Sequence, residues 1–233
     1  MSGAESFAAP SPDLSREAPA IADPSVVVDR GEPASPEPAT YQVVDPAVTR
    51  AKYEAEVAEY RRIEDGQRRR GWWLLDATFP RVFVVFATPQ LRPPAVLCGV
   101  EVVFTNYDFE PPSVRLVDPF TREPYRRKNL PTALFRRQMV EVSLGGAVQR
   151  VARPVELMQA HGPDEIPFLC IPGVREYHLH PAHTGDSWSL HRGLGAGKLY
   201  HILNTIYQYG VQPISNYGIG LHVVGFEQGE PPA

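Results

Sequence analysis

The sequence predicts an α+β fold with an N-terminal helix, an antiparallel β-meander, an irregular segment rich in histidine and a C-terminal helix. Three observations lead to this order: a run without helix breakers after Asp45-Pro46, three short apolar stretches separated by prolines, and an apolar stripe after Gly197. With 43% hydrophobic residues among 233, the chain can bury one sizeable core. We therefore expect a single domain over residues 41–233.

A different composition precedes this domain. Residues 1–40 consist mainly of Pro, Ala, Ser and acidic residues. Prolines this frequent break helices and remove donors from β-ladders. We predict that residues 1–40 form a disordered arm.

The first helix is expected to begin at Asp45, because an Asp followed by a proline combines an N-cap with a residue suited to the first helical turn. No breaker follows until Gly66, and the helical run extends towards Gly71. Tyr53, Val57 and Tyr60 recur at helical spacing. These three side chains should therefore lie on one face of the helix.

The meander is predicted from apolar or alternating stretches bounded by prolines and turn residues. Three antiparallel strands are expected over residues 82–88, 95–105 and 113–119. A polar, basic loop should follow over residues 125–134, and residues 139–158 form either a hairpin around Gly145-Gly146 or an insertion.

The last helix is expected between Gly197 and Gly210. Within it Leu199, Ile202, Leu203, Ile206 and Tyr207 recur every three or four residues, which makes one apolar stripe.

Charge and composition exclude several classes of protein. The formal net charge of −4 gives no reason to expect nucleic acid or an anionic membrane as a partner. Two cysteines are too few for a disulfide framework, the N-terminus lacks the pattern of a signal peptide, and the longest apolar run, residues 82–87, is too short to span a bilayer. We expect a cytoplasmic protein.

Residues that can carry chemistry are concentrated in the segment from His161 to His191. This segment contains five of the seven histidines and one of the two cysteines. Glu176, His178 and His180 alternate in the sequence, so an extended backbone would aim all three side chains at one face. Two imidazoles at this spacing can share one metal ion.

Cys170 can add a soft ligand to this set, since zinc accepts thiolate, carboxylate and imidazole ligands together. His183 can replace Glu176 or His180. The alternative is that His178 and His180 lie on an exposed edge and that Cys170 is a small buried apolar residue.

The stretch VEVVFTNYDFEPPSVRLVDP, residues 100–119, resembles the middle of the ubiquitin-conjugating enzyme fold, in which a strand enters an aromatic and double-proline turn. In this sequence the turn contains Tyr107, Phe109, Pro111 and Pro112. The order of helix, meander and turn also matches that family, so the resemblance implies a UBC-like fold.

The same family places a His-Pro-Asn motif before its catalytic cysteine, and a Trp-Ser pair and a helix after it. This sequence has His161-Gly162-Pro163-Asp164 before Cys170, and Trp188-Ser189 after it. The asparagine is missing, and the interval from Cys170 to Trp188 is longer than in the family. The resemblance implies that Cys170 accepts an acyl group, with His161, His178 or His180 as the base.

The inserted segment also resembles a bacterial domain family with predicted Cys, Glu, His and His metal ligands that is associated with ubiquitin-like modification systems. This resemblance implies that the ligands are Cys170, Glu176, His178 and either His180 or His183. The expected cofactor is zinc, and the expected partners are a ubiquitin-like protein and its activating enzyme.

Three functions therefore compete for these residues. The first is a metal-binding, conjugating-enzyme-like protein of a bacterial ubiquitin-like modification pathway. The second is an active transferase that forms a thioester on Cys170. These two functions exclude each other, because a thiolate bound to zinc is a poor nucleophile and one sulfur cannot serve both purposes. The third is a zinc-dependent hydrolase with Glu176 as the base.

Overall fold

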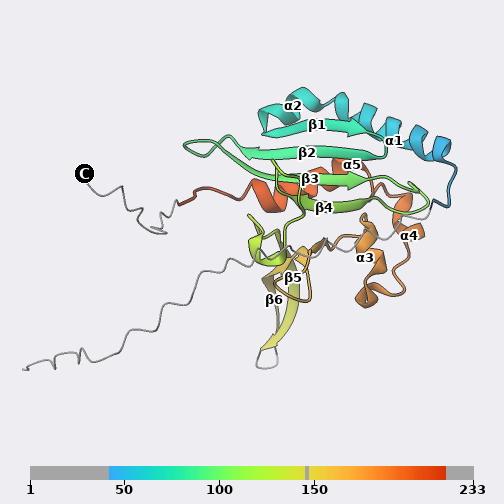
Figure 1. The fold of residues 1–233 in the computed structure, drawn as a ribbon. Helices are drawn as coiled ribbons and strands as arrows, with labels where there is room; N and C mark the ends of the chain where they lie inside the picture. Colours follow the sequence, from blue (N-terminus) through green and yellow to red (C-terminus); the bar gives the residue numbers. More distant parts are fainter. Residues whose placement is uncertain (1–41, 145–146, 219–233) are drawn as a thin grey trace, which may run out of the picture. The chain divides into compact units, whose positions relative to one another are not determined.

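A computed structural model describes residues 42–144 and 147–218 (Figure 1). These residues belong to one of the two units into which the chain divides, Thr40–Ala233. The arm predicted over residues 1–40 lies outside the described residues.

The N-terminal helical region is split into α1 (Pro46–Arg61) and α2 (Glu64–Arg69). The start of α1 is as predicted, because the Asp45 carboxylate caps the helix by accepting a hydrogen bond of 2.8 Å from the Ala47 N–H. Tyr53 and Tyr60 are buried, and Val57 is partly buried against the core, so the face that these three side chains share is the one that packs inward.

A four-stranded antiparallel sheet follows in the order β1-β2-β3-β4 (Figure 1). The predicted strands are confirmed as β2 (Arg81–Thr88), β3 (Ala95–Val103) and β4 (Ser113–Val117). β1 (Trp72–Thr78) was not expected from the sequence. Its exposed positions carry Trp73 and Leu75, so the apolar-polar alternation that marks a strand is hidden.

The main core lies between one face of this sheet and the helices α1 and α5 (Leu199–Ile206). The predicted stripe of α5 is fully buried: Leu199, Ile202, Leu203 and Ile206 have no exposed surface. A π-helical turn, Tyr207–Val211, continues α5. The chain therefore has the predicted α+β class.

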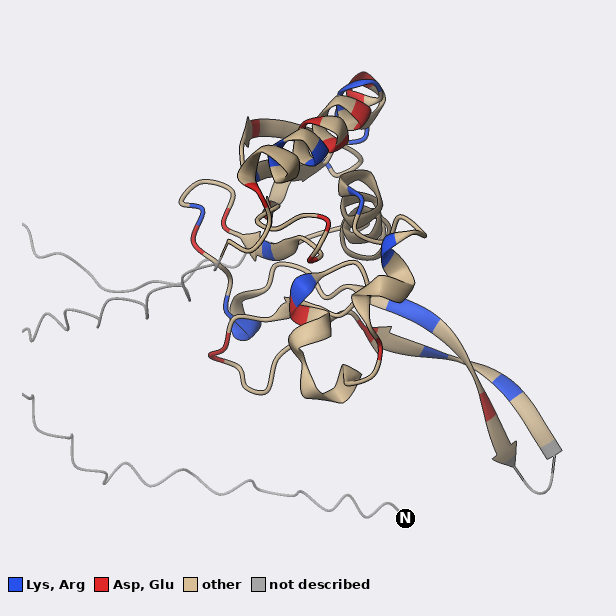
Figure 2. Cartoon of the chain, turned by 90° about the vertical axis from the view of Figure 1, so that its right-hand side faces the viewer, with Lys and Arg blue, Asp and Glu red and all other residues tan. Residues whose placement is uncertain are grey.

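A separate two-stranded hairpin consists of β5 (Phe135–Leu144) and β6 (Ala147–Glu156). Of the two alternatives for residues 139–158, the hairpin is the one observed, and Gly145-Gly146 lie outside the described residues. Figures 1 and 2 show that it extends away from the four-stranded sheet. The basic segment before it is the predicted loop and contains one 3-10 turn, Arg127–Asn129.

Short elements connect the hairpin to α5. They are β7 (Met158–Gln159), β8 (Phe168–Leu169), α3 (Arg175–Leu179), a 3-10 turn at Pro181–His183, and α4 (Trp188–Arg192). Among the helices described, none has both the length and the apolar character needed to cross a membrane.

Candidate functional site

Cys170 lies directly after β8, at the base of the β5–β6 hairpin. Its backbone N–H donates to the carbonyl of Leu157 at 2.7 Å, and the Leu157 N–H donates to the carbonyl of Leu134 at 2.7 Å. Leu134, Leu157 and Leu169 are buried, so the backbone of Cys170 is anchored in the core. Its side chain is partly exposed.

The Cys170 thiol contacts the imidazole of His183. The Sγ and Nε2 atoms are 3.3 Å apart. Burial raises the pKa of the Cys170 thiol, with the positive charge of Arg136 acting in the opposite direction. Burial and then the neighbouring His180 lower the pKa of His183. Both shifts favour the neutral forms, in which the S–H group donates to the unprotonated Nε2.

Tyr177 holds the His183 ring from one side. The two rings are stacked with 3.8 Å between their centroids. The Tyr177 hydroxyl donates to Asp186 Oδ2 at 2.6 Å, and the other oxygen of Asp186 lies 2.5 Å from His191 Nε2. These contacts lower the pKa of Asp186, which keeps its carboxylate ionised as an anchor for Tyr177.

The histidine cluster continues from His183 to His180 and then to His161. The ring centroids of His180 and His183 are 5.6 Å apart, and those of His161 and His180 are 5.4 Å apart. His180 Nδ1 accepts a hydrogen bond from the Ala182 N–H at 3.3 Å. The structure thus brings together four of the predicted site residues: Cys170, His183, His180 and His161.

His178 has a different environment. Its Nδ1 lies 2.8 Å from the carbonyl of Asp186, and its Nε2 lies 2.6 Å from the carbonyl of Pro172. A ring nitrogen that donates to a carbonyl has no lone pair left for another partner. In this arrangement His178 braces two backbone segments on either side of α3.

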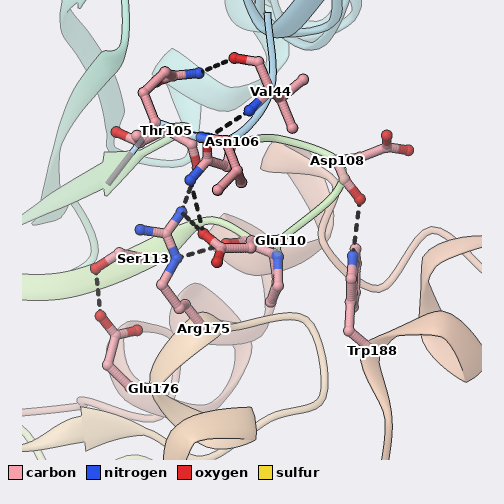
Figure 3. A network of polar contacts seen from close by, with 12 residues as sticks. Val44, Thr105, Asn106, Asp108, Glu110, Ser113, Arg175, Glu176 and Trp188 are labelled. Carbon is pink, nitrogen blue, oxygen red and sulfur yellow. Dashed lines mark hydrogen bonds and ion pairs between the residues drawn. The ribbon is translucent and has the colours of Figure 1, made fainter. Parts of the chain in front are cut away.

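The extended backbone expected for residues 176–180 is wrong, because Arg175–Leu179 forms α3. Glu176 therefore does not share a strand face with His178 and His180. Its carboxylate accepts from the Ser113 hydroxyl and from the Val114 N–H at 3.4 Å (Figure 3). A short run of mixed residues does not distinguish a helical turn from a strand by periodicity alone.

The network around Glu176 joins the segment after Cys170 to the double-proline turn (Figure 3). The Arg175 guanidinium donates to the carbonyl oxygens of Thr105 and, at 3.2 Å, Pro111. The Trp188 indole N–H donates to the carbonyl of Asp108 at 2.9 Å. These contacts hold α3 and α4 against the turn before β4.

Three contributors to the site were not predicted: Tyr177, Asp186 and Arg136. Tyr177 and Asp186 act through contacts between residues of an irregular segment, where no periodic pattern indicates which side chains meet. Within residues 42–144 and 147–218, no group of three or more His, Cys, Asp or Glu side chains is arranged to hold a metal ion.

The comparisons with known proteins agree on one family. The model of the Y4jH family matches residues 44–214. A protein of Sinorhizobium fredii (strain NBRC 101917 / NGR234), described as "Uncharacterized protein y4jH", is 42% identical over 187 residues, which cover 78% of this chain and 91% of that protein. The matched region includes every element from α1 to α5 and the cluster around Cys170. The chain therefore belongs to the Y4jH family.

Proposed function

We propose that this chain is a ubiquitin-conjugating-enzyme-like protein in which Cys170 accepts the C-terminal acyl group of a ubiquitin-like protein as a thioester. The observation that supports this proposal is the 3.3 Å contact between Cys170 Sγ and His183 Nε2 on a partly exposed site. A nucleophile in hydrogen-bond contact with a base is the arrangement that covalent acyl transfer requires. The partners are a ubiquitin-like protein and its activating enzyme in the cytoplasm.

The order of elements also supports the proposal. A helix, a four-stranded meander with the double-proline turn between β3 and β4, then Cys170, Trp188 and a final helix follow one another as in the fold that the sequence resembles. Trp188 and Arg175 both contact the turn, so the segment that carries Cys170 packs beside it.

The proposed step is a thioester exchange. As His183 Nε2 takes the proton of the thiol, Cys170 Sγ attacks the carbonyl carbon of the incoming thioester. The carbon–sulfur bond to the donor thiol breaks, and the departing thiolate receives the proton from His183. His183 replaces His161 as the candidate base, because His161 contacts His180 rather than the thiol.

A second candidate function, metal binding, is favoured by the same Cys170 and His183 pair. Zinc bonds of about 2.3 Å to sulfur and about 2.0 Å to nitrogen in a tetrahedral site separate the two ligand atoms by about 3.5 Å, close to the 3.3 Å observed. Among the described residues no third ligand is placed beside this pair, and His180 would have to turn to supply one. We do not propose the zinc hydrolase, because Glu176, its expected base, is bound to Ser113 and Val114.

The test uses a peptide that ends in Gly-Gly as a mercaptoethanesulfonate thioester. We expect intact-mass spectrometry to show one acyl group per chain, which excess thiol removes. Cys170→Ala should abolish the adduct, whereas Cys98→Ala should keep it, because Cys98 is fully buried. His183→Gln should slow its formation at least tenfold, and His201→Gln, an exposed position on α5, should not. An adduct that survives Cys170→Ala would refute the proposal.

A further inference from the structure

The β5–β6 hairpin has no core of its own. In the described part of the chain its sheet contains two strands only, and an isolated two-stranded hairpin is marginally stable in water. Large apolar side chains along both strands are exposed: Phe135, Met139, Val142, Val148 and Val151. Exposed strand edges with apolar side chains are templates for pairing with another extended chain.

The base of this hairpin is also the support of Cys170. Leu157, the residue after β6, accepts a hydrogen bond from the Cys170 N–H and donates one to the carbonyl of Leu134, the residue before β5. At the same end of the hairpin, burial raises the pKa of the Cys170 thiol and the positive charge of Arg136 lowers it. A segment that lies along the hairpin and reaches its base therefore arrives beside Cys170.

The hairpin is basic. It carries four arginines, Arg136, Arg137, Arg150 and Arg153, against two glutamates, and Figure 2 shows these basic positions along both strands. Both glutamates are already paired, Glu141 with Arg150 at 3.4 Å and Glu156 with Arg127 of the preceding loop at 2.6 Å.

Three arginines of the hairpin take no part in these two ion pairs. Within the described residues, Arg136, Arg137 and Arg153 have no ion pair. Arg136 and Arg153 lie on one face, because Arg153 is opposite Gln138 in the register, and Arg137 lies on the other. Acidic groups that approach either face would therefore meet an uncompensated positive charge.

We propose that the β5–β6 hairpin docks an extended, acidic C-terminal segment of the ubiquitin-like protein. Docking would guide the end of that segment, which carries the acyl group, to Cys170. Main-chain pairing along a strand edge would supply affinity. The arginines would raise the rate of association and favour acidic segments over other partners. Charge argues against a second copy of this chain as the occupant, because two hairpins would bring their unpaired arginines together. This inference rests on the proposed function.

The experiment uses two peptides of ten residues that differ only in three positions, glutamate in one and lysine in the other. Each ends in a vinyl sulfone, to which Cys170 Sγ adds while the thiol proton passes to the neighbouring carbon. This alkylation requires no acyl transfer. The rate is measured on the full chain by intact mass, and Cys170→Ala identifies the site.

We expect the acidic peptide to alkylate Cys170 about tenfold faster than the basic peptide at low salt, and the difference to shrink as salt screens the charges. The double variant Arg137→Glu/Arg153→Glu should reverse the preference. The matched control Arg62→Glu/Arg69→Glu makes the same change of net charge at exposed positions of the N-terminal helical region and should retain the preference.

An equal change of preference in the two double variants would overturn the inference, because it would reflect net charge alone. A dimer that depends on Arg137 and Arg153 in sedimentation would also overturn it in favour of a second copy. Uncharged iodoacetamide should alkylate both variants at the same rate, which verifies that Cys170 is intact. If the charge preference is found but the thioester probe gives no adduct, the proposed function fails and the docking surface does not.

Discussion

The replacement His183→Gln tests the role of the imidazole most closely, because glutamine keeps a nitrogen near the Nε2 position but cannot take up a proton. In the structure this nitrogen lies 3.3 Å from Cys170 Sγ. The pKa of the thiol is raised by burial, so the thiol is protonated at neutral pH. Reaction of Cys170 near pH 7 then depends on proton transfer to His183.

The magnitude follows from the ionisation of the thiol. A thiol with an ordinary pKa near 8.5 is about 3% ionised at pH 7, and burial lowers this fraction for Cys170. Loss of the base should therefore slow alkylation by iodoacetamide at pH 7 about 30-fold or more. The assay is the rate of carbamidomethylation of Cys170, with His201→Gln as the control.

The pH dependence gives a second readout. The pKa of His183 is lowered from 6.5 by burial and by His180, so the wild-type rate should fall only when the pH drops below 6.5 and His183 becomes protonated. In His183→Gln the rate should instead rise with pH through the alkaline range, as for an unassisted thiol. Identical profiles for the two proteins would refute the assignment of His183 as the base.

The same shift predicts a change in stability. Below pH 6.5 the unfolded chain binds a proton at His183 more readily than the folded chain does, so the free energy of unfolding should decrease as the pH falls from 6.5 through the lower pKa of the folded state. Comparing urea denaturation of the wild type and His183→Gln over this range isolates the contribution of His183. A dependence of equal slope in both proteins would show that other groups cause it.

Three further replacements separate structure from chemistry. Glu176→Ala should lower the free energy of unfolding by about 1–3 kcal/mol, because it removes hydrogen bonds to a carboxylate, while the alkylation rate of Cys170 stays within twofold of wild type. Glu54→Ala, at an exposed position of α1, is the control. A large loss of Cys170 reactivity in Glu176→Ala would assign Glu176 to the site. Tyr177→Phe keeps the ring stacked on His183 but loses the bond to Asp186, so it should slow alkylation a few-fold, and an unchanged rate would remove Tyr177 from the positioning of His183. Ile202→Ala should lower the free energy of unfolding by about 2–5 kcal/mol in urea denaturation, since its side chain is fully buried, and a loss below 1 kcal/mol would contradict the core.

Much of the fold could be predicted from the sequence because several elements carry strong local signals. The Asp45 cap, the proline-bounded strands and the apolar stripe of α5 all lie where the residues indicated. β1 could not be predicted, since Trp73 and Leu75 are exposed and hide the alternation. For residues 139–158 the sequence left a hairpin and an insertion open, and no local pattern indicated that the base of the observed hairpin lies beside Cys170.

The site could be predicted by composition but not by geometry. The concentration of histidines around Cys170 pointed to the segment that contains the Cys170 and His183 pair. The arrangement of that pair depends on α3 and on the 3-10 turn at Pro181–His183, which place His183 on the thiol and Glu176 on Ser113. Such contacts arise from tertiary packing, and the alternation of Glu176, His178 and His180 in the sequence was misleading.

Whether Cys170 is free to act as a nucleophile is determined by measuring acylation and metal content on the same sample. Full-length protein grown with added zinc and purified without a tag is treated with the Gly-Gly thioester peptide before and after chelation. We expect one thiol-sensitive acyl group on Cys170, to the same extent in both samples. One mole of zinc per mole of chain, with acylation only after the zinc is removed, would contradict it and make Cys170 a metal ligand.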